Sequence, residues 1–202
     1  MVQAVRIRVF AALLTAVALA ACAASKNPVG PASEAVSEPR LAGIWTYGGK
    51  EEGRRDILHI IPRDDSGTTF AIIFVDHADR DWAVLDGYVT AIGERRFVNL
   101  QLHAASASLM TEIDSQGHKD SHPYSFVAYA FEEDDVLRTA LPREALYEAV
   151  KEERLAGETS GDYDVFVSAD SGDIAAFLGT VDAADLFKDA HRYHRSQFPG
   201  QP

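Results

Sequence analysis

The stretch Phe97-Val98-Asn99-Leu100-Gln101-Leu102-His103 decides the fold, because apolar and polar side chains alternate along it. Successive side chains of a β-strand point to opposite faces, so the two kinds of side chain separate onto two faces. The apolar face comprises Val98, Leu100 and Leu102, and the polar face comprises Asn99, Gln101 and His103. The pattern predicts a half-buried strand whose second face is wet or lines a polar cavity.

Runs of the same kind lie on both sides of this stretch, with short turn sequences between them. Turns such as 64–67 and 93–95 have the lengths that join antiparallel neighbours, whereas helical crossovers need more residues. The sequence therefore predicts an antiparallel β-meander. Its expected strands are 41–47, 57–61, 70–75, 82–92, 97–102, 124–131 and 136–140.

The apolar period becomes helical after residue 140. Residues 142–155 are expected to form a helix that Gly157 stops, and 163–167 to form one more strand. Asp170 or Ser171 would cap a second helix and Asp182 a third. The apolar stripe of the second helix would be Ile174, Phe177, Leu178 and Val181. That of the third would be Leu186, Phe187, Ala190 and Tyr193. This order predicts an α+β fold, an antiparallel β-meander or partly closed barrel with about three helices packed at its C-terminal part.

The N-terminus has the anatomy of a secretory signal peptide, residues 1–21. Arg6 and Arg8 precede an apolar run, 9–21, that is shorter than the ~20 residues of a spanning helix. Its end, Leu19-Ala20-Ala21-Cys22, resembles the lipobox of bacterial lipoproteins. An ordinary cleavage site with a nearby Cys is the alternative.

The lipobox resemblance implies that Cys22 becomes acylated, with palmitate or similar chains as the membrane attachment. It also implies a location in the bacterial cell envelope. Because Ala23 and not Asp follows the Cys, the periplasmic face of the outer membrane is favoured. Cys22 is the only Cys, so disulfides, thiol catalysis and Cys-ligated zinc are not expected.

Composition sets the expected domain boundaries. Residues 22–40 are small and polar with three prolines, which predicts an acylated Cys and a flexible tether. Residues 41–196 are expected to form a single globular domain, and 197–202 a polar tail.

The charge limits the classes of partner. The net charge is −12, and loss of Arg6 and Arg8 with the signal peptide leaves 17 basic and 31 acidic residues, or −14. This charge disfavours nucleic acid and anionic lipid. Plain solubility or recognition of a basic partner are the two interpretations of the acidic surplus.

The opening Leu41-Ala42-Gly43-Ile44-Trp45 resembles the Gly-x-Trp start of lipocalins, with Gly43 and Trp45 at the matching positions. The resemblance covers roughly residues 41–102, and lipocalin-like bacterial lipoproteins of uncharacterised function share it. It implies an antiparallel barrel whose base is plugged by Trp45. Lipocalins have eight strands and one C-terminal helix, whereas this sequence predicts about seven strands and three helices.

Two functions fit these observations. The first is an envelope-anchored lipoprotein that binds a small apolar or envelope-derived ligand between the sheet and the helices. The expected ligand-binding residues are Trp82, Tyr88, His103, Phe126 and Tyr129. The alternative is a protein-interaction lipoprotein, an inhibitor or immunity factor against a basic wall-acting enzyme.

No metal, cofactor or catalytic residue is expected. His118, Asp120 and His122 lie within 104–123, a segment that is a lid or a solvated insertion, and His191 and His194 are one helical turn apart. Solvated surface is the preferred interpretation of both groups, and His59 is expected in the core or in a cavity. Because neither G-x-S-x-G nor H-E-x-x-H occurs, an enzyme is not predicted, with an envelope hydrolase as a third alternative.

Overall fold

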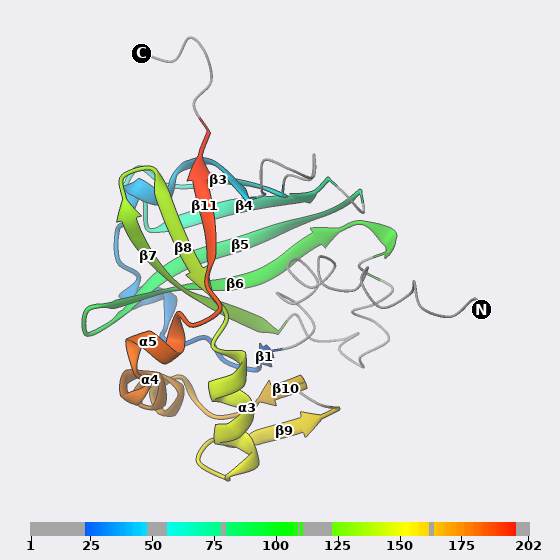
Figure 1. Cartoon of the computed structure of the whole chain (residues 1–202), viewed down its shortest axis with the longest axis vertical. Helices are drawn as coiled ribbons and strands as arrows, with labels where there is room; N and C mark the ends of the chain where they lie inside the picture. The colour runs from blue at the N-terminus through cyan, green and yellow to red at the C-terminus, as the bar shows by residue number, and fades with distance from the viewer. Residues whose placement is uncertain are drawn as a thin grey trace, which may run out of the picture.

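The computed structural model describes residues 23–47, 56–77, 80–108, 110, 123–161 and 164–196. A β-barrel forms one part, and the helices with three short strands lie at one end of it (Figure 1). The barrel strands are β2 (Gly43–Tyr47), β3 (Asp56–Pro62), β4 (Thr69–Asp76), β5 (Asp81–Ile92), β6 (Arg95–Ala105), β7 (Tyr124–Glu133), β8 (Val136–Ala140) and β11 (His191–Arg195). The other elements are β1 (Ala23–Ser25), β9 (Gly157–Ser160), β10 (Asp164–Val167), the short 3₁₀ turns η1 (Ala32–Glu34) and η2 (Pro39–Leu41), and helices α3 (Arg143–Lys151), α4 (Ser171–Thr180) and α5 (Ala183–Leu186).

The barrel closes. Strands β2 to β8 pair antiparallel with their neighbours in chain order, and β11 lies between β8 and β2. Closure leaves none of these eight strands with an open edge. The α+β class expected from the sequence is confirmed, and the closed barrel is consistent with a lipocalin-like fold.

The closing strand β11 corrects the expected third helix. Helix α5 ends at Leu186, and Tyr193 lies in a strand opposite Leu137. The Asp182 side chain does cap α5, accepting from the Ala184 N–H at 2.7 Å. The apolar residues beyond Leu186 have helical spacing, but His191–Arg195 forms a strand. It does so because its backbone pairs with both β2 and β8, whose facing backbone groups would otherwise be unpaired.

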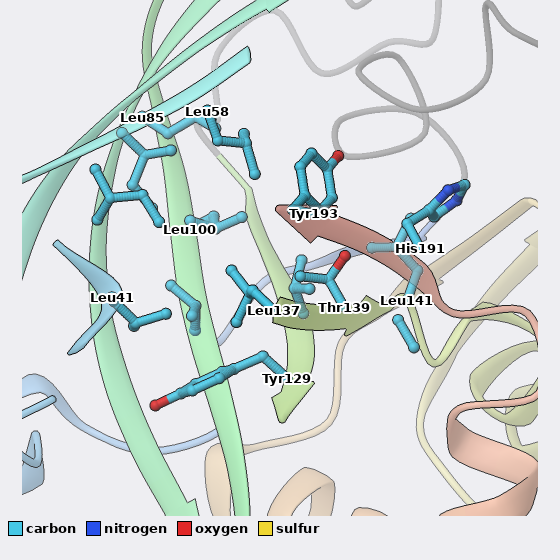
Figure 2. A pocket seen from close by; sticks show the side chains of 15 residues that line it. Leu41, Leu58, Leu85, Leu100, Tyr129, Leu137, Thr139, Leu141, His191 and Tyr193 are labelled. Atoms are coloured by element: carbon cyan, nitrogen blue, oxygen red, sulfur yellow. The ribbon is translucent and has the colours of Figure 1, made fainter. Parts of the chain in front are cut away.

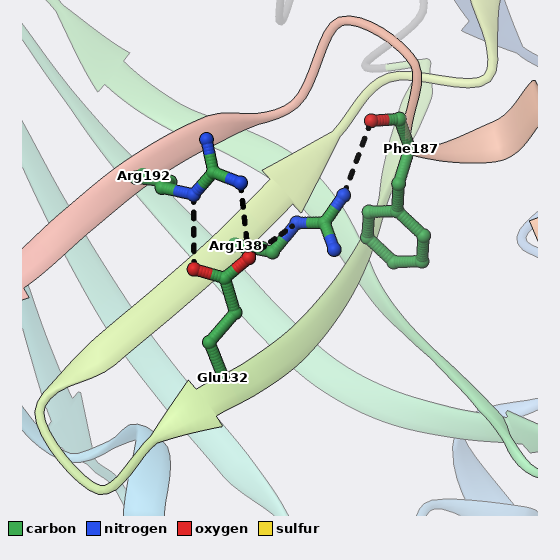
Figure 3. Close-up of polar contacts among 4 residues, drawn as sticks. All are labelled: Glu132, Arg138, Phe187 and Arg192. Carbon is green, nitrogen blue, oxygen red and sulfur yellow. Dashed lines mark hydrogen bonds and ion pairs between the residues drawn. The ribbon is translucent and has the colours of Figure 1, made fainter. Parts of the chain in front are cut away.

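An ionic cluster holds β11 to the barrel wall (Figure 3). The Arg192 guanidinium donates two hydrogen bonds to the Glu132 carboxylate, at 2.9 and 3.1 Å. Arg138 Nε lies 3.2 Å from the same carboxylate, and Arg138 Nη2 donates to the Phe187 carbonyl at 3.3 Å. The hydrogen bond from Arg192 lowers the pKa of Glu132. The cluster thus connects β7, β8 and β11 with Phe187, the C-cap residue of α5.

Trp45 plugs one end of the barrel. Its side chain is fully buried, and Nε1 donates to the Leu41 carbonyl at 2.8 Å. The Phe131 ring lies 6.0 Å away between centroids. The expected burial of Trp45 is confirmed.

The described residues form two large apolar cores, because the outer wall of the barrel is itself covered, and a small third cluster around Ala83. One core fills the barrel and includes Trp45, Phe70 and Leu137. The other lies outside the barrel, where Phe97 and Phe126 pack with residues of α3, α4 and β10. Asn99 shares the outward face of β6 with Phe97 and is buried beneath this layer, which corrects the expected wet polar face at that position.

Residues 23–41 form part of the fold, so the expected flexible tether is wrong for this segment. Strand β1 pairs parallel with β10 and touches β7 through Ser25. Val29 is fully buried, and its N–H donates to Asn99 Oδ1 at 2.7 Å. Ala23 and Ala24 are both buried, and Ala23 packs in the core outside the barrel.

The C-terminal layer follows the expected order with one further correction. Helix α3 covers β9 and β10, and α4 begins with the Asp170 carboxylate accepting from the Asp173 N–H at 2.9 Å. Gly157 is the first residue of β9 and does not end a helix. Glycine is needed there because a side chain would collide with the Phe166 carbonyl on the neighbouring strand β10. Within the described residues, no helix has the length and apolar character needed to cross a bilayer.

Candidate ligand-binding cavity

A cavity of about 80 Å³ lies inside the barrel. Its wall is almost entirely apolar because the inward residues of seven barrel strands converge on it. The lining residues are Leu41, Leu58, Ile60, Ile72, Leu85, Val98, Leu100, Val127, Tyr129, Leu137, Thr139, Ala140, Leu141, His191 and Tyr193.

The two sides of the cavity differ in chemistry. Figure 2 shows Leu58, Leu85 and Leu100 together on one side and the polar-tipped Thr139, His191 and Tyr193 on the other. The Tyr47 ring meets the His191 ring edge-on at 5.0 Å between centroids, and it lies 5.5 Å from the Tyr193 ring. An apolar chain with one polar end matches this division, since Thr139, His191 and Tyr193 bring their hydrogen-bonding groups together on the same side.

The ionisable groups in the wall are held neutral. Burial lowers the pKa of His191, which Asp189 partly offsets. Burial raises the pKa of Tyr193, and Asp56 adds to that effect. The cavity therefore presents neutral hydrogen-bonding groups at neutral pH.

Tyr129 lies at the other end of the lining set. Burial and the nearby Glu38 carboxylate raise the pKa of its hydroxyl. Among the described residues no group meets hydrogen-bond geometry with that buried hydroxyl, although Glu38 is close enough to affect its ionisation. The hydroxyl is thus a second polar point at the edge of an apolar space.

The volume limits what can enter. Engineered apolar cavities of about 150 Å³ hold benzene, and sites for drug-sized ligands span ~300 to 1,000 Å³. At about 80 Å³ the cavity accommodates a slender group such as part of a hydrocarbon chain. Larger ring systems would require the wall to move, and close-packed interiors resist that movement.

One of the five expected ligand-binding residues lines this cavity. Tyr129 does, with its ring among the inward side chains of β7. Phe126 points to the outer side of the same strand and packs in the second core. Trp82 lies on β5 and is 41% exposed, facing away from the barrel interior.

Tyr88 and His103 also lie outside the cavity. The Tyr88 hydroxyl donates to the Gly30 carbonyl at 2.7 Å, and so helps to hold the N-terminal segment on the outer wall. His103 is largely exposed, and its Nδ1 lies 3.4 Å from Asp86. Tyr88 lines an outer groove described below, and His103 contacts Asp86 of that groove.

The histidine groups do not form a metal site in the part of the chain described. His191 lines the cavity, whereas His194 points outward, because three residues apart on a strand means opposite faces. His118, Asp120 and His122 lie outside the described residues. Within the described ranges no group of three His, Cys, Asp or Glu side chains is placed to hold a metal ion. His59 alternates with the cavity residues Leu58 and Ile60, so it belongs to the outer face and not to the core.

Most residues that line the cavity are aliphatic, so a search for aromatic side chains in the sequence could not find them. Leu58, Leu100 and Leu137 looked like ordinary core residues, and the alternation in β3 and β6 was the only available signal. His191 was missed because its segment was expected to be helical. No family model, curated protein or solved structure matches the chain.

Proposed function

We propose that the protein binds a slender apolar ligand inside the barrel, with the polar end of the ligand beside Thr139 and His191. The observation that carries this proposal is the apolar cavity with hydrogen-bonding groups on one side. A closed barrel is compatible with such a role. The ligand class is a hydrocarbon chain that ends in a neutral or acidic oxygen group.

Burial of a hydrocarbon chain would supply the binding energy, and the small volume excludes a larger ring. Each methylene taken from water into an apolar site contributes ~0.8 kcal/mol. A polar end left unpaired in the barrel would cost more than one such methylene, so a partner such as the Thr139 hydroxyl or the His191 imidazole is needed.

The proposed setting is the bacterial envelope, with acylated Cys22 as the anchor and the periplasmic face of the outer membrane as the location. The lipobox-like Leu19-Ala20-Ala21-Cys22 supports this. Because β1 begins at Ala23, the proposed anchor at Cys22 would directly precede the folded domain, without a spacer. The barrel would then be held close to the source of an envelope-derived ligand.

A matched pair of variants tests the ligand proposal. Leu58→Phe places extra volume in the cavity, whereas Ile57→Phe adds the same ring type one residue away on the outer face. Titration of the full chain with decanol and with decanoate should show weakened binding for Leu58→Phe and unchanged binding for Ile57→Phe. Equal binding by both variants would place the ligand outside the barrel.

A second function, recognition of a basic wall-acting enzyme, is supported by an apolar outer face. The outward residues of β2 to β5 lie in cross-strand rows, Ile44, His59, Ile73 and Val84 in one and Thr46, Ile57, Val75 and Trp82 in the next. Trp82, 41% exposed, and Ile61, 36% exposed and further along the outer face of β3, are large apolar groups in contact with water. The net charge of −14 after signal removal would favour a basic partner.

The test of this second function uses a basic lysozyme as the probe. Inhibition of the lysozyme by the full chain should be lost in Ile73→Asp, which puts a charge in the centre of the face, and retained in Leu58→Phe. Absence of any inhibition by the unaltered chain would remove this candidate.

A further inference from the structure

A second cavity lies on the outer wall of the barrel, separate from the interior. It is an open groove of about 340 Å³ across β4 to β7 and the residue after β3. We call it the outer groove, and it is lined by Arg63, Thr69, Phe70, Asp86, Gly87, Tyr88, Gln101 and Tyr124. Its volume falls within the ~300 to 1,000 Å³ of small-molecule sites, unlike that of the interior cavity.

The strand register builds the groove. Asp86 is opposite Gln101, and Gln101 is opposite Tyr124, so these three side chains form one row across β5, β6 and β7. Tyr88, two residues from Asp86 on the same face, lies opposite Thr69. The aromatic rings thus stand beside carboxylate and amide groups on one continuous surface.

A β-bulge adds His103 to this surface. The register between β5 and β6 shifts between Val84 and Leu85, where Leu102 and Ala104 are the partners and His103 is the extra residue. Bulges re-aim side chains and bend strands. Here the exposed imidazole, 62% accessible, lies 3.4 Å from Asp86 Oδ2.

The charges in the groove nearly cancel. Arg63 forms an ion pair with Asp86 through Nη2 and Oδ1, and His103 contacts the other oxygen of the same carboxylate. The carboxylate would repel an anion such as phosphate, and the guanidinium would repel a cation. A neutral ligand that can both donate and accept hydrogen bonds is therefore favoured.

We propose that the outer groove binds a neutral saccharide chain. Pyranose rings present apolar faces that can lie on the Tyr88 and Tyr124 rings, and their hydroxyls can pair with Asp86, Arg63 and Gln101. Aromatic residues provide rigid contact area, and planar carboxylate, guanidinium and amide groups provide direction. This site is distinct from the interior cavity and does not depend on the function proposed for it.

The probes are cellotetraose, maltotetraose and chitotetraose, each added to the full ¹⁵N-labelled chain, with amide shifts as the measurement. At least one of them should shift the amides of β5, β6 and β7 in the groove, with a Kd near or below ~1 mM. Inorganic phosphate should leave those amides unchanged.

Variants make the assignment specific. Tyr124→Ala and Asp86→Ala should each weaken binding about tenfold, which corresponds to the loss of one good contact. Tyr124→Phe keeps the ring and should bind within about threefold of the unaltered chain. Thr46→Ala, on the outer face of β2 and away from the groove, serves as the control.

Three outcomes would overturn the proposal. They are no shift with any of the three saccharides, unchanged affinity in both Tyr124→Ala and Asp86→Ala, or phosphate shifting the groove amides in place of the saccharides. Asp86 is 45% exposed, so its variant keeps the test valid if Tyr124→Ala does not fold.

Discussion

The guanidinium of Arg195 lies over the ring of Trp45, with its Cζ 4.2 Å from the ring centroid. Arg195 also donates to the carbonyls of Ala42 at 2.7 Å and Arg40 at 2.5 Å. The last strand of the barrel therefore fastens the turn that precedes the first one. This contact joins β11 to β2 and to the turn before it.

Replacement of Trp45 should severely destabilise the domain. Truncation of a buried Trp to Ala costs ~3 to 5 kcal/mol because burial is lost and a cavity remains. The chain has only one other tryptophan, Trp82, which is 41% exposed, so Trp82→Ala is a matched control. Denaturant unfolding should show a large loss for Trp45→Ala and a small one for Trp82→Ala. Similar losses for both would mean that Trp45 does not plug the barrel.

Asn99 should hold the N-terminal segment on the outer wall. Its Oδ1 accepts from the Val29 N–H, and its Nδ2 donates to the Thr90 hydroxyl at 2.8 Å. Asn99→Ala would leave a buried N–H unpaired, which costs ~1 to 3 kcal/mol. His103→Ala, on the same strand but exposed, should change the unfolding free energy little. Hydrogen exchange at Val29 that stays slow in Asn99→Ala would contradict this role.

Glu132 should make stability depend on pH in the acidic range. The pKa of Glu132 in the folded state is lowered from 4.5, so its carboxylate stabilises the fold above pH 4.5. That contribution is lost as pH falls through the lowered pKa, because protonation breaks the bond to Arg192. Unfolding of the unaltered chain and of Glu132→Gln should differ at pH 7, and the difference should shrink as the pH is lowered below 4.5.

Salt provides the control for this effect. The cluster is partly exposed, so added salt should reduce the difference between the two proteins at pH 7. A difference that is independent of both pH and salt would show that Glu132 acts by packing alone.

Cys22→Ser should release the domain from the membrane without unfolding it. The change removes the proposed acylation site, and the side chains that hold β1 begin at Ala23. Membrane fractionation with palmitate labelling is the measurement, and the melting temperature of the released protein is the control. A Cys22→Ser protein that remains in the membrane fraction after the signal peptide is cleaved would show that another attachment exists.

Local alternation predicted the barrel wall well where, as in β4 and β5, every second residue is buried. Which face would be interior was harder to predict. Both faces of β6 and β7 are apolar near Phe97 and Phe126, since the helical layer covers the outside of the barrel there. Aromatic character therefore led to the wrong prediction that Phe126 lines the ligand site, whereas it packs outside the barrel.

Long-range pairing explains the remaining errors. Strand β1 is three residues long, and its partner Val165 is far away in the sequence, so composition alone indicated a tether. Strand β11, His191-Arg-Tyr-His-Arg, has few apolar residues, and its strand conformation depends on β2 and β8. His191 entered the cavity wall only through that pairing.

The interior cavity is tested most directly by intermolecular nuclear Overhauser effects between decanol and the methyl groups of the full chain. The ligand proposal predicts contacts from the decanol chain to Leu58, Leu100 and Leu137, which line the cavity. Contacts to the outward methyls of Ile57 and Ile73, or no contacts at all, would contradict it.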